Sequence, residues 1–360
     1  MKTTVNTEIE DSIRKALLNK GEIDFSDLLD KAKICLSDNL MLPPVCLSYR
    51  NGMASSTILT LGNISVVQGK AKARKSTWVQ MMAAVMISGK SLFHLDSNLP
   101  ADKTKILYFD TEQSAYHCQR NLKRINTITE GVNINQRLLF FSLRPYSSAE
   151  RFNIIEHALT HISGVGLVVI DGIRDLLNDF NDIEQSNTLV NHLMKWSTEN
   201  NIHILCVLHQ NKGNTEARGH LGSELNNKAE TIISVTKAKD VESVSIAESV
   251  MMRDMDFPPI AFMVDANGNP QVDDNHVENN DGKKGNAKNI YTISADSHKE
   301  ALRDVFKTQQ AYGYGELVSA LKATYGRFGI ELGTNKTKEM LSLHVNDRYI
   351  KLENRKYYLG

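Results

Sequence analysis

The sequence predicts an α/β protein built around a mostly parallel sheet. Short apolar runs alternate with longer helical patterns from about residue 57 to 265. A loop rich in lysine, Gly69 to Ser76, follows one of these runs and opens a helix. Two further runs end in carboxylates. Strands that alternate with helices in this way are typical of a parallel sheet covered by helices.

Length and composition favour one large core and a smaller module. The chain has 360 residues, 41% of them hydrophobic, and its formal net charge is zero. This balance neither demands nor excludes a nucleic-acid partner, because a local basic face would not show in the sum. The cysteines form no CxxC pair, which favours buried thiols in a reducing compartment. No signal peptide is evident and no apolar run approaches the ~20 residues that span a bilayer, so we expect a cytoplasmic protein without membrane contact.

Eight apolar, β-rich runs are the predicted strands. The early runs are almost uniformly apolar, as expected for strands that are buried on both faces. The later ones lie closer together in the sequence, so they could pair as antiparallel hairpins. The runs are Ile64–Val67, Ile106–Phe109, Leu138–Leu143, Leu167–Ile170, Ile202–Leu208, Thr231–Val235, Ile246–Met251 and Ile260–Val264.

The chain outside this region divides into three further parts. Residues 1–44 are predicted to be an amphipathic helical segment up to about residue 40, ended by Pro43-Pro44. Residues 45–265 form the main domain, and residues 266–292, rich in Asn, Asp, Gly and Lys, are a predicted flexible linker. Residues 293–360 are predicted to be a winged-helix-like module with helices at Lys299–Phe306, Glu316–Tyr325 and Lys336–Val345, followed by a hairpin of Arg348–Leu352 and Lys356–Leu359.

The strongest motif follows the first strand of the main domain. In a loop between a strand and a helix, backbone N–H groups and the positive helix end bind phosphate. Lys75 would then reach the β- and γ-phosphates, and the Ser76 hydroxyl would ligate Mg²⁺. The expected nucleotide contacts are Gly69, Lys70, Ala71, Lys72, Ala73, Arg74, Lys75, Ser76 and Thr77. The alternative for the loop by itself is a basic surface loop after a strand.

Arg74 departs from the GxxxxGK[ST] pattern, which has glycine at this position. The position lies close to the phosphates, so the Arg74 side chain must point away or take part. An arginine that takes part could stabilise phosphate charge within its own chain.

Two further strands end in acids that would lie beside this loop. Ligands of open α/β sheets bind outside the carboxyl ends of the strands. Asp171 after Leu167–Ile170 fits the acid that holds Mg²⁺ through water, although it could instead cap the next helix. Glu112 is the candidate that orients and polarises the attacking water, and Asp110 is the neighbouring alternative.

A polar cluster ends the strand Ile202–Leu208. His209 and Gln210 stand where a sensor of the γ-phosphate would be placed, although ordinary strand-end polarity is the alternative.

The order of these motifs resembles the RecA-like family, and within it the RepA-type hexameric plasmid helicases and the related DnaB-type replicative helicases. The motifs are the phosphate loop, a strand ending in Asp-x-Glu, a strand ending in Asp and a strand ending in His-Gln. Residues 217–223 resemble the loop after the sensor strand of that family, and residues 251–262 the strand pair that carries a basic residue toward a neighbouring subunit. The resemblance covers about residues 45–265.

The resemblance implies a RecA-like ATPase that uses ATP and Mg²⁺. It implies that Lys75 and Ser76 bind phosphate and Mg²⁺, that Glu112 is the catalytic carboxylate and Asp171 the metal-binding acid, and that Gln210 with His209 senses the γ-phosphate. Arg253 would act on the site of a neighbouring subunit, with Arg218 as second choice. It further implies a homo-oligomer, expected to be a hexameric ring, that works on single-stranded DNA in the replication or mobilisation of a plasmid or other mobile element, with a primase or similar protein as a possible partner.

Two other functions stay open at this point. Arg74 is compatible with an adaptor or regulator that binds ATP with little turnover. Lys70 stands where ParA-like partition ATPases carry their signature lysine. In the C-terminal module, Lys336 and Lys338 could contact phosphates and Tyr349 and Tyr357 could lie along a DNA groove, or the module could bind protein.

Overall fold

The computed structural model describes residues 25–51, 54–210, 219–239, 241–274, 295–327, 332–346, 348–353 and 355–360. The chain divides into two units, Met1–Leu42 and Pro43–Gly360, and each is described by itself. None of the helices in these ranges is long and apolar enough to cross a membrane.

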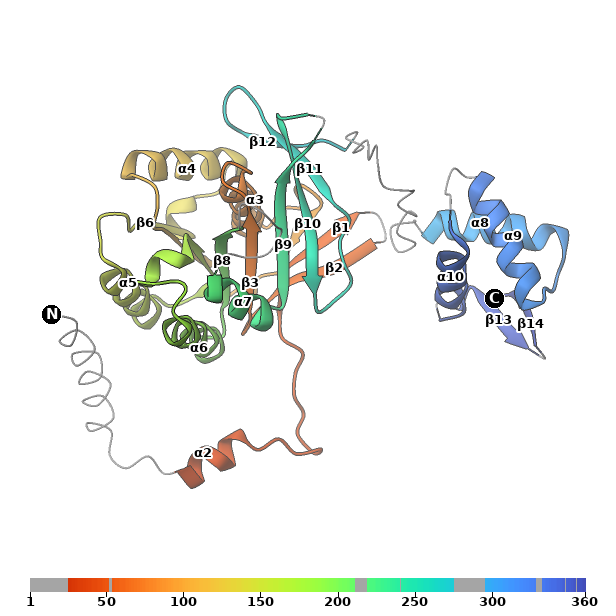
Figure 1. The fold of residues 1–360 in the computed structure, drawn as a ribbon, viewed down its shortest axis with the longest axis horizontal. Coiled ribbons are helices and arrows are strands. Elements are labelled where there is room, and N and C mark those ends of the chain that lie inside the picture. The colour runs from red at the N-terminus through yellow and green to blue at the C-terminus, as the bar shows by residue number, and fades with distance from the viewer. Residues whose placement is uncertain are drawn as a thin grey trace. The chain divides into compact units, whose positions relative to one another are not determined.

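The first unit contains one described helix, α2 (Phe25–Ala32), drawn in red in Figure 1. The sequence predicted helix up to about residue 40, and this is wrong beyond Ala32. The carboxylate of Asp38 accepts a hydrogen bond from the backbone N–H of Cys35 at 2.7 Å, which replaces helical pairing with a turn. The predicted helix before residue 25 lies outside the described residues.

The predicted fold class, α/β with a mostly parallel sheet, is confirmed. Within the described residues, nine strands form one sheet in the order β12-β11-β10-β9-β3-β8-β7-β5-β6. The neighbours from β9 to β6 pair in parallel, and β9, β10, β11 and β12 pair antiparallel, as the spacing of the later runs suggested. The strands are β3 (Ile64–Gly69), β5 (Lys105–Asp110), β6 (Leu138–Ser142), β7 (Val165–Asp171), β8 (His203–His209), β9 (Thr231–Lys237), β10 (Val244–Met252), β11 (Ile260–Val264) and β12 (Pro270–Val272).

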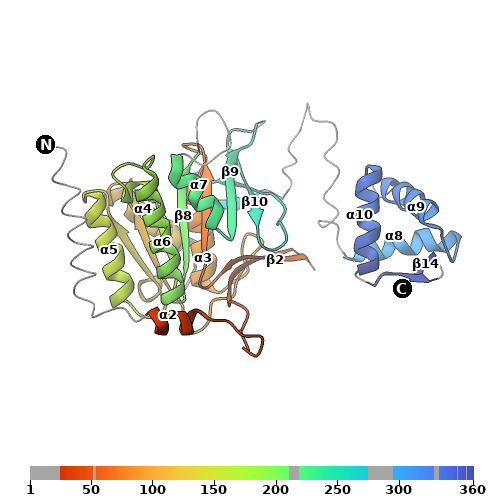
Figure 2. The ribbon, with the colours of Figure 1, turned by 60° about the horizontal axis from the view of Figure 1, so that its bottom comes forward.

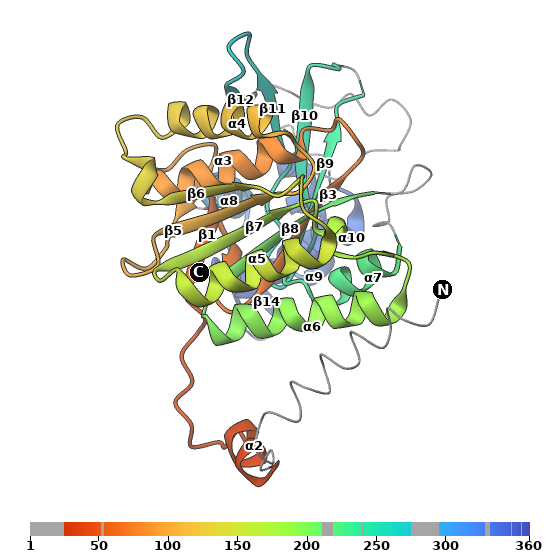
Figure 3. The ribbon, with the colours of Figure 1, turned by 90° about the vertical axis from the view of Figure 1, so that its left-hand side faces the viewer.

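Helices cover both faces of this sheet, and Figure 3 shows the two layers. The helices α3 (Lys75–Ser88) and α4 (Ala115–Ile128) lie on one face; α5 (Ser148–His161), α6 (Ile183–Glu199) and α7 (Gly219–Lys228) lie on the other (Figures 2 and 3). Because side chains alternate along a strand, Ile106 and Tyr108 enter the core on the α3 side and Leu107 and Phe109 the core on the other. This explains the uniformly apolar runs.

A small antiparallel sheet, which the sequence analysis did not anticipate, covers α3. It has the order β2-β1-β4, formed by β1 (Val45–Asn51), β2 (Ala54–Thr60) and β4 (Leu95–Ser97). Its apolar side chains share one core with α3, in which the side chains from Trp78 to Ile87 are all buried. A helix that is apolar on every side is buried on every side, and here this second sheet makes that possible.

The predicted start of the flexible linker, residue 266, is too early in the chain. Residues 266–274 are part of the large sheet's edge, because β12 pairs with β11 from Phe262↔Val272 to Val264↔Pro270. The carboxylate of Asp265 accepts hydrogen bonds from the backbone N–H groups of Asn267 and Asn269, which closes the tight turn between them. The remainder of the predicted linker, to residue 292, lies outside the described residues.

The C-terminal part contains the three helices and the hairpin that the sequence predicted. They are α8 (Ala295–Thr308), α9 (Tyr314–Arg327), α10 (Thr334–Asn346), β13 (Ile350–Glu353) and β14 (Lys356–Leu359). They enclose a hydrophobic core of their own, and Tyr349 and Tyr357 pack against it. Lys336 forms an ion pair with Glu339 at 2.9 Å. The two tyrosines and this lysine therefore have structural contacts within the module.

Candidate nucleotide site

The candidate site lies at the carboxyl ends of four neighbouring parallel strands, β3, β8, β7 and β5. The sheet register places Gly69 beside His209 and Asp110 beside Asp171. Motifs that are up to about 140 residues apart in the sequence therefore meet at one edge of the sheet, which is where open α/β sheets bind ligands.

The phosphate loop leaves β3 at a glycine that the packing requires. A Cβ atom at Gly69 would lie 2.2 Å from the carbonyl oxygen of Val235 on β9. The loop then turns, with a hydrogen bond from the N–H of Ala73 to the carbonyl of Lys70 at 3.2 Å, and α3 begins at Lys75. Lys70, Ala71 and Lys72 are exposed, so the outer part of the loop is open to a ligand.

Arg74 directs its side chain away from this loop. Its backbone is left-handed, with φ 69° and ψ 33°, which is the conformation that a glycine would adopt without strain. Its Nη1 donates a hydrogen bond to Ser245 Oγ on β10 at 3.0 Å. Of the two possibilities left by the sequence, the structure thus has the side chain pointing away, toward β10.

Lys75 is buried and already has partners inside the site. Its Nζ donates hydrogen bonds to the carbonyls of Gly69 at 3.0 Å and Lys70 at 3.1 Å, and it lies 3.1 Å from Nδ1 of His209. Burial lowers the pKa of the ammonium group, while the negative charges of Asp171 and Glu112 oppose this change. The ammonium group therefore lies among carbonyl oxygens and carboxylates, where a phosphate would add further acceptors.

Asp171 and Ser76 form the pair that would bind a metal ion. The Asp171 carboxylate is buried and accepts a hydrogen bond from the Tyr108 hydroxyl at 2.8 Å, and the Ser76 hydroxyl is near enough to help lower its pKa. Burial raises the pKa of this carboxyl, and both hydroxyls counteract the increase. A hydroxyl and a carboxylate side by side next to a phosphate loop are oxygen ligands that suit Mg²⁺, so the residues present fit the ion.

The two acids at the carboxyl end of β5 have different environments. Asp110 is buried, and its Oδ1 accepts hydrogen bonds from the backbone N–H groups of Glu112 and Gln113, at 3.0 and 2.8 Å, so it shapes the turn that presents Glu112. Burial and the neighbouring Asp171 raise the pKa of Asp110 to about 6. Glu112 is half-exposed, and a hydrogen bond from His209 at 3.1 Å lowers its pKa. Of the two acids, only Glu112 combines ionisation with access to solvent.

Of the other predicted residues, Gln210 lies at this edge and Arg253 does not. Gln210 is buried beside the loop, and its backbone N–H donates to the carbonyl of Gly69 at 3.1 Å. Arg253 lies at the opposite end of the parallel strands, near their amino ends. It follows β10, and its backbone N–H donates to the carbonyl of Glu230, next to the start of β9. It cannot reach the nucleotide site of its own chain. Arg218 lies outside the described residues.

Three residues that the sequence analysis did not select also belong to this edge. Thr111 Oγ1 lies within 3.1 Å of the Asp171 and Gly172 carbonyls and of Asp175 Oδ2, so it fastens the turn after β7 to the end of β5. Arg174 in that turn stacks its guanidinium on the ring of Phe180 at 3.9 Å and contributes to the lowered pKa of Glu112. Tyr108 is the hydrogen-bond donor to Asp171. The available signal was that each lies within three residues of one of the acids in the sequence.

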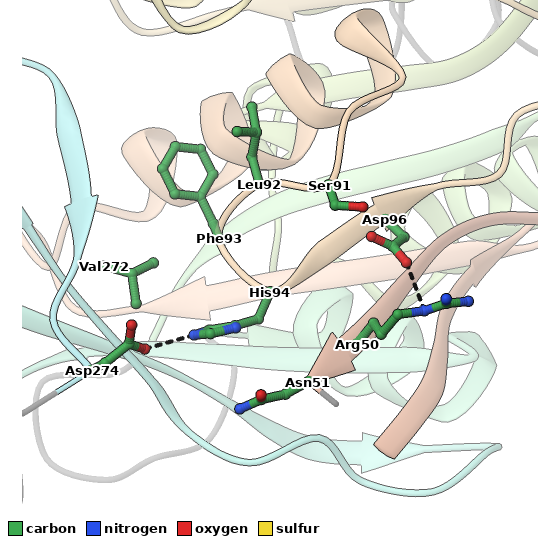
Figure 4. Close-up of a pocket in the computed structure, with 9 residues that line it drawn as sticks. All are labelled: Arg50, Asn51, Ser91, Leu92, Phe93, His94, Asp96, Val272 and Asp274. Atoms are coloured by element: carbon green, nitrogen blue, oxygen red, sulfur yellow. Dashed lines mark hydrogen bonds and ion pairs between the residues drawn. The ribbon is translucent and has the colours of Figure 1, made fainter. Parts of the chain in front are cut away.

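A separate surface pocket of about 420 Å³ shares no residue with this site (Figure 4). An ion pair between Arg50 and Asp96 at 2.8 Å and a hydrogen bond between His94 Nε2 and Asp274 Oδ1 at 2.6 Å lie in its wall. Phe93 and His94 have left-handed backbones, with φ values of 58° and 60°. The Arg50–Asp96 ion pair lies within the small sheet, between β1 and β4, and the His94–Asp274 contact joins the segment just before β4 to the end of β12.

Comparison with known proteins agrees with a P-loop domain. Residues 50–215 match the family described as AAA domain. This range contains the phosphate loop, both acids at the carboxyl end of β5, Asp171 and the end of β8. No curated protein sequence matches the chain. Together, the site and the AAA match support an ATP-binding domain of the P-loop ATPase class.

Solved structures with a similar fold include a RadB recombinase, which is 18% identical, and a KaiC-like protein from the hyperthermophilic archaeon Pyrococcus horikoshii, which is 14% identical. Each similarity covers 59% of this chain, and 91% and 90% of the other chains, with a TM-score of 0.41 in both cases.

Proposed function

We propose that the chain is a RecA-like ATPase that hydrolyses ATP at this sheet edge and couples hydrolysis to work on single-stranded DNA. The observation that carries the proposal is the meeting of Lys75, Glu112 and Asp171 from three separate segments at the carboxyl ends of the strands. A phosphate-binding lysine, an ionised carboxylate and a metal-binding acid are the groups that in-line attack of water on a γ-phosphate requires.

Each residue has one task in this proposal. Lys75 binds the β- and γ-phosphates, and its ammonium group balances their charge. Mg²⁺, held by Ser76 and by Asp171 through water, would supply charge neutralisation at the phosphates when bound. Glu112 orients the attacking water and accepts its proton, and the lowered pKa keeps it in the ionised form that this task needs. Gln210 lies close enough to the loop to respond to an occupied γ-phosphate position.

The proposal includes an oligomer in which Arg253 acts on the neighbouring subunit. Its place at the edge opposite to the site excludes action within the same chain and suits action between chains. An arginine that stabilises the transition state from outside leaves isolated subunits slow. A hexameric ring, plasmid or mobile-element replication and a primase partner remain parts of the proposal that rest on the resemblance.

The test is ATP turnover with and without single-stranded DNA, measured beside the light-scattering mass at the same protein concentration. The proposal expects turnover that rises with DNA, that requires an oligomer and that is lost in Lys75→Ala. Tight ATP binding without turnover under any condition would contradict it and favour the adaptor function. Because the Arg74 side chain is bound to Ser245, it gives no reason to expect such an inactive site.

A further inference from the structure

A continuous chain of polar contacts joins the phosphate loop to the proposed catalytic carboxylate through one histidine. His209 lies with Nδ1 3.1 Å from Lys75 Nζ and with Nε2 3.1 Å from Glu112 Oε1. The three residues come from α3, the end of β8 and the segment after β5. Lys75 is buried, while His209 and Glu112 are about one-third and one-half exposed, so the chain runs from the loop toward solvent.

The chemistry of the two partners determines which nitrogen of His209 carries the proton. A lysine ammonium group has three donors and no acceptor, so Nδ1 of His209 must accept. An ionised glutamate only accepts, so Nε2 must donate. The neutral tautomer with its proton on Nε2 satisfies both contacts, and the other neutral tautomer satisfies neither.

A bound phosphate would compete for the same ammonium group. In the present arrangement the acceptors around Lys75 Nζ are the carbonyls of Gly69 and Lys70 and Nδ1 of His209. Phosphate oxygens carry more negative charge than any of these acceptors and form stronger hydrogen bonds with an ammonium group. Because an ammonium group has only three donors, at least one present partner is lost when the β- and γ-phosphates bind. Of these three acceptors, only Nδ1 of His209 belongs to a side chain, and this side chain can rotate away from Lys75.

On the basis of the proposed function, we propose that His209 is a positioning residue that couples occupancy of the phosphate loop to the orientation of Glu112. Without nucleotide, His209 holds Lys75 and Glu112 together. When a phosphate binds the Lys75 ammonium group, His209 loses its contact with Lys75. Its Nε2–H still donates to Glu112 and then orients this carboxylate toward the attacking water. Binding and the activation of the carboxylate are thereby linked through a single side chain.

Two substitutions separate the two contacts of His209. The amide oxygen of asparagine can take the position of Nδ1 and accept from Lys75, but asparagine has no group at the position of Nε2. The amide of glutamine reaches the position of Nε2 and can donate to Glu112. His209→Ala removes both contacts, and His161→Asn, at the exposed last residue of α5, is the matched control for a histidine elsewhere. Thermal unfolding identifies any variant that does not fold.

We expect loss of the Glu112 contact to lower kcat and loss of the Lys75 contact to change nucleotide affinity. His209→Asn and His209→Ala should lower kcat about tenfold to hundredfold, because a hydrogen bond to a charged group is lost, and His209→Gln should recover most of that loss. His209→Gln and His209→Ala should bind Mg·ATP about three- to tenfold more tightly than His209→Asn, because Lys75 has lost a competing acceptor. Equal kcat and affinity in the asparagine and glutamine variants would overturn the proposal.

Nitrogen NMR of ¹⁵N-labelled histidine provides a readout that a purely structural role would not move. The His209 signal, assigned by its absence in His209→Gln, should show the Nε2–H tautomer without nucleotide and should shift at Nδ1 when Mg²⁺ and the non-hydrolysable analogue AMP-PNP are added. An Nδ1–H tautomer, or a spectrum unchanged by bound nucleotide, would contradict the coupling. If wild type neither binds nor hydrolyses ATP, the proposed function fails, and the nucleotide-free tautomer alone decides whether His209 links the two residues.

Discussion

At the scale of single residues, the direction of the Arg74 side chain could not be predicted from the sequence. The sequence shows an arginine where a phosphate loop has glycine, and it leaves open whether the side chain enters the site. The answer depends on Ser245, 171 positions away on β10, which accepts the guanidinium group. The same limit applies to Lys75, Glu112 and Asp171. Their types and their places after apolar runs could be predicted, but their hydrogen bonds to His209 and Tyr108 depend on the register between strands.

We predict that Arg74→Gly and Arg74→Ala differ in stability and agree in function. Both lose the hydrogen bond to Ser245, but only glycine relieves the left-handed backbone, so Arg74→Gly should be more stable than Arg74→Ala by about 1–2 kcal/mol. Nucleotide affinity should stay within about threefold of wild type in both. Chemical denaturation and nucleotide titration measure the two quantities. A large loss of affinity in Arg74→Gly would show that the guanidinium group does contact phosphate.

At the scale of elements, burial decided which strands could be predicted. The strands β3, β5, β7 and β8 are covered on both faces, and apolar residues therefore dominate them. In contrast, β1 and β2 read VCLSYRN and ASSTILT, and β4 has three residues. Their serines, threonines and charged residues carry no clear strand pattern, and their pairing depends on α3, whose buried surface they cover. The edge strand β12 was missed because its neighbours have a linker composition.

The C-terminal helices contain a buried histidine pair that predicts a pH-dependent stability. Tyr325 OH lies 2.6 Å from Nδ1 of His298 and 3.1 Å from Nε2 of His344. Burial, reinforced by His298, lowers the pKa of His344 to about 3. The unfolded state therefore takes up a proton below about pH 6.5 and the folded state does not, so stability is constant above that pH and falls below it.

We predict that these helices lose about 2 kcal/mol of stability between pH 7 and pH 5 through His344 alone. Hydrogen exchange of α9 and α10 in the full chain, corrected for the intrinsic pH dependence, gives the change in opening free energy. His344→Gln keeps a polar side chain that does not titrate. The variant should therefore lose about 2 kcal/mol less stability than wild type between pH 7 and pH 5. An identical pH dependence in both proteins would contradict a neutral buried His344.

At the scale of the whole molecule, the proposed function needs a residue from a second chain. Lys75, Glu112 and Asp171 lie at one edge of the sheet and Arg253 at the other. This separation predicts complementation between two inactive variants. In a mixed oligomer, a Lys75→Ala subunit retains Arg253, and it can supply this residue to the intact loop of an Arg253→Ala subunit.

Each variant by itself should have less than about a tenth of wild-type turnover, and the mixture should recover a measurable part of it. The measurement is ATP turnover as a function of the mixing ratio at constant total protein. Turnover that equals the weighted sum of the separate variants at every ratio would exclude a contribution of Arg253 between subunits.

The most direct test of the central claim, that the loop from Gly69 to Ser76 binds nucleotide through its buried lysine, compares two lysines of that loop. Binding of a fluorescent ATP analogue with Mg²⁺ is measured for wild type, Lys75→Ala and Lys70→Ala. Because the Lys75 ammonium group is buried in the site and Lys70 is exposed, we expect at least about a tenfold loss of affinity in Lys75→Ala and less than about a threefold change in Lys70→Ala. Equal affinity in all three proteins would contradict the claim, and a loss confined to Lys70→Ala would favour a ParA-like partition ATPase instead.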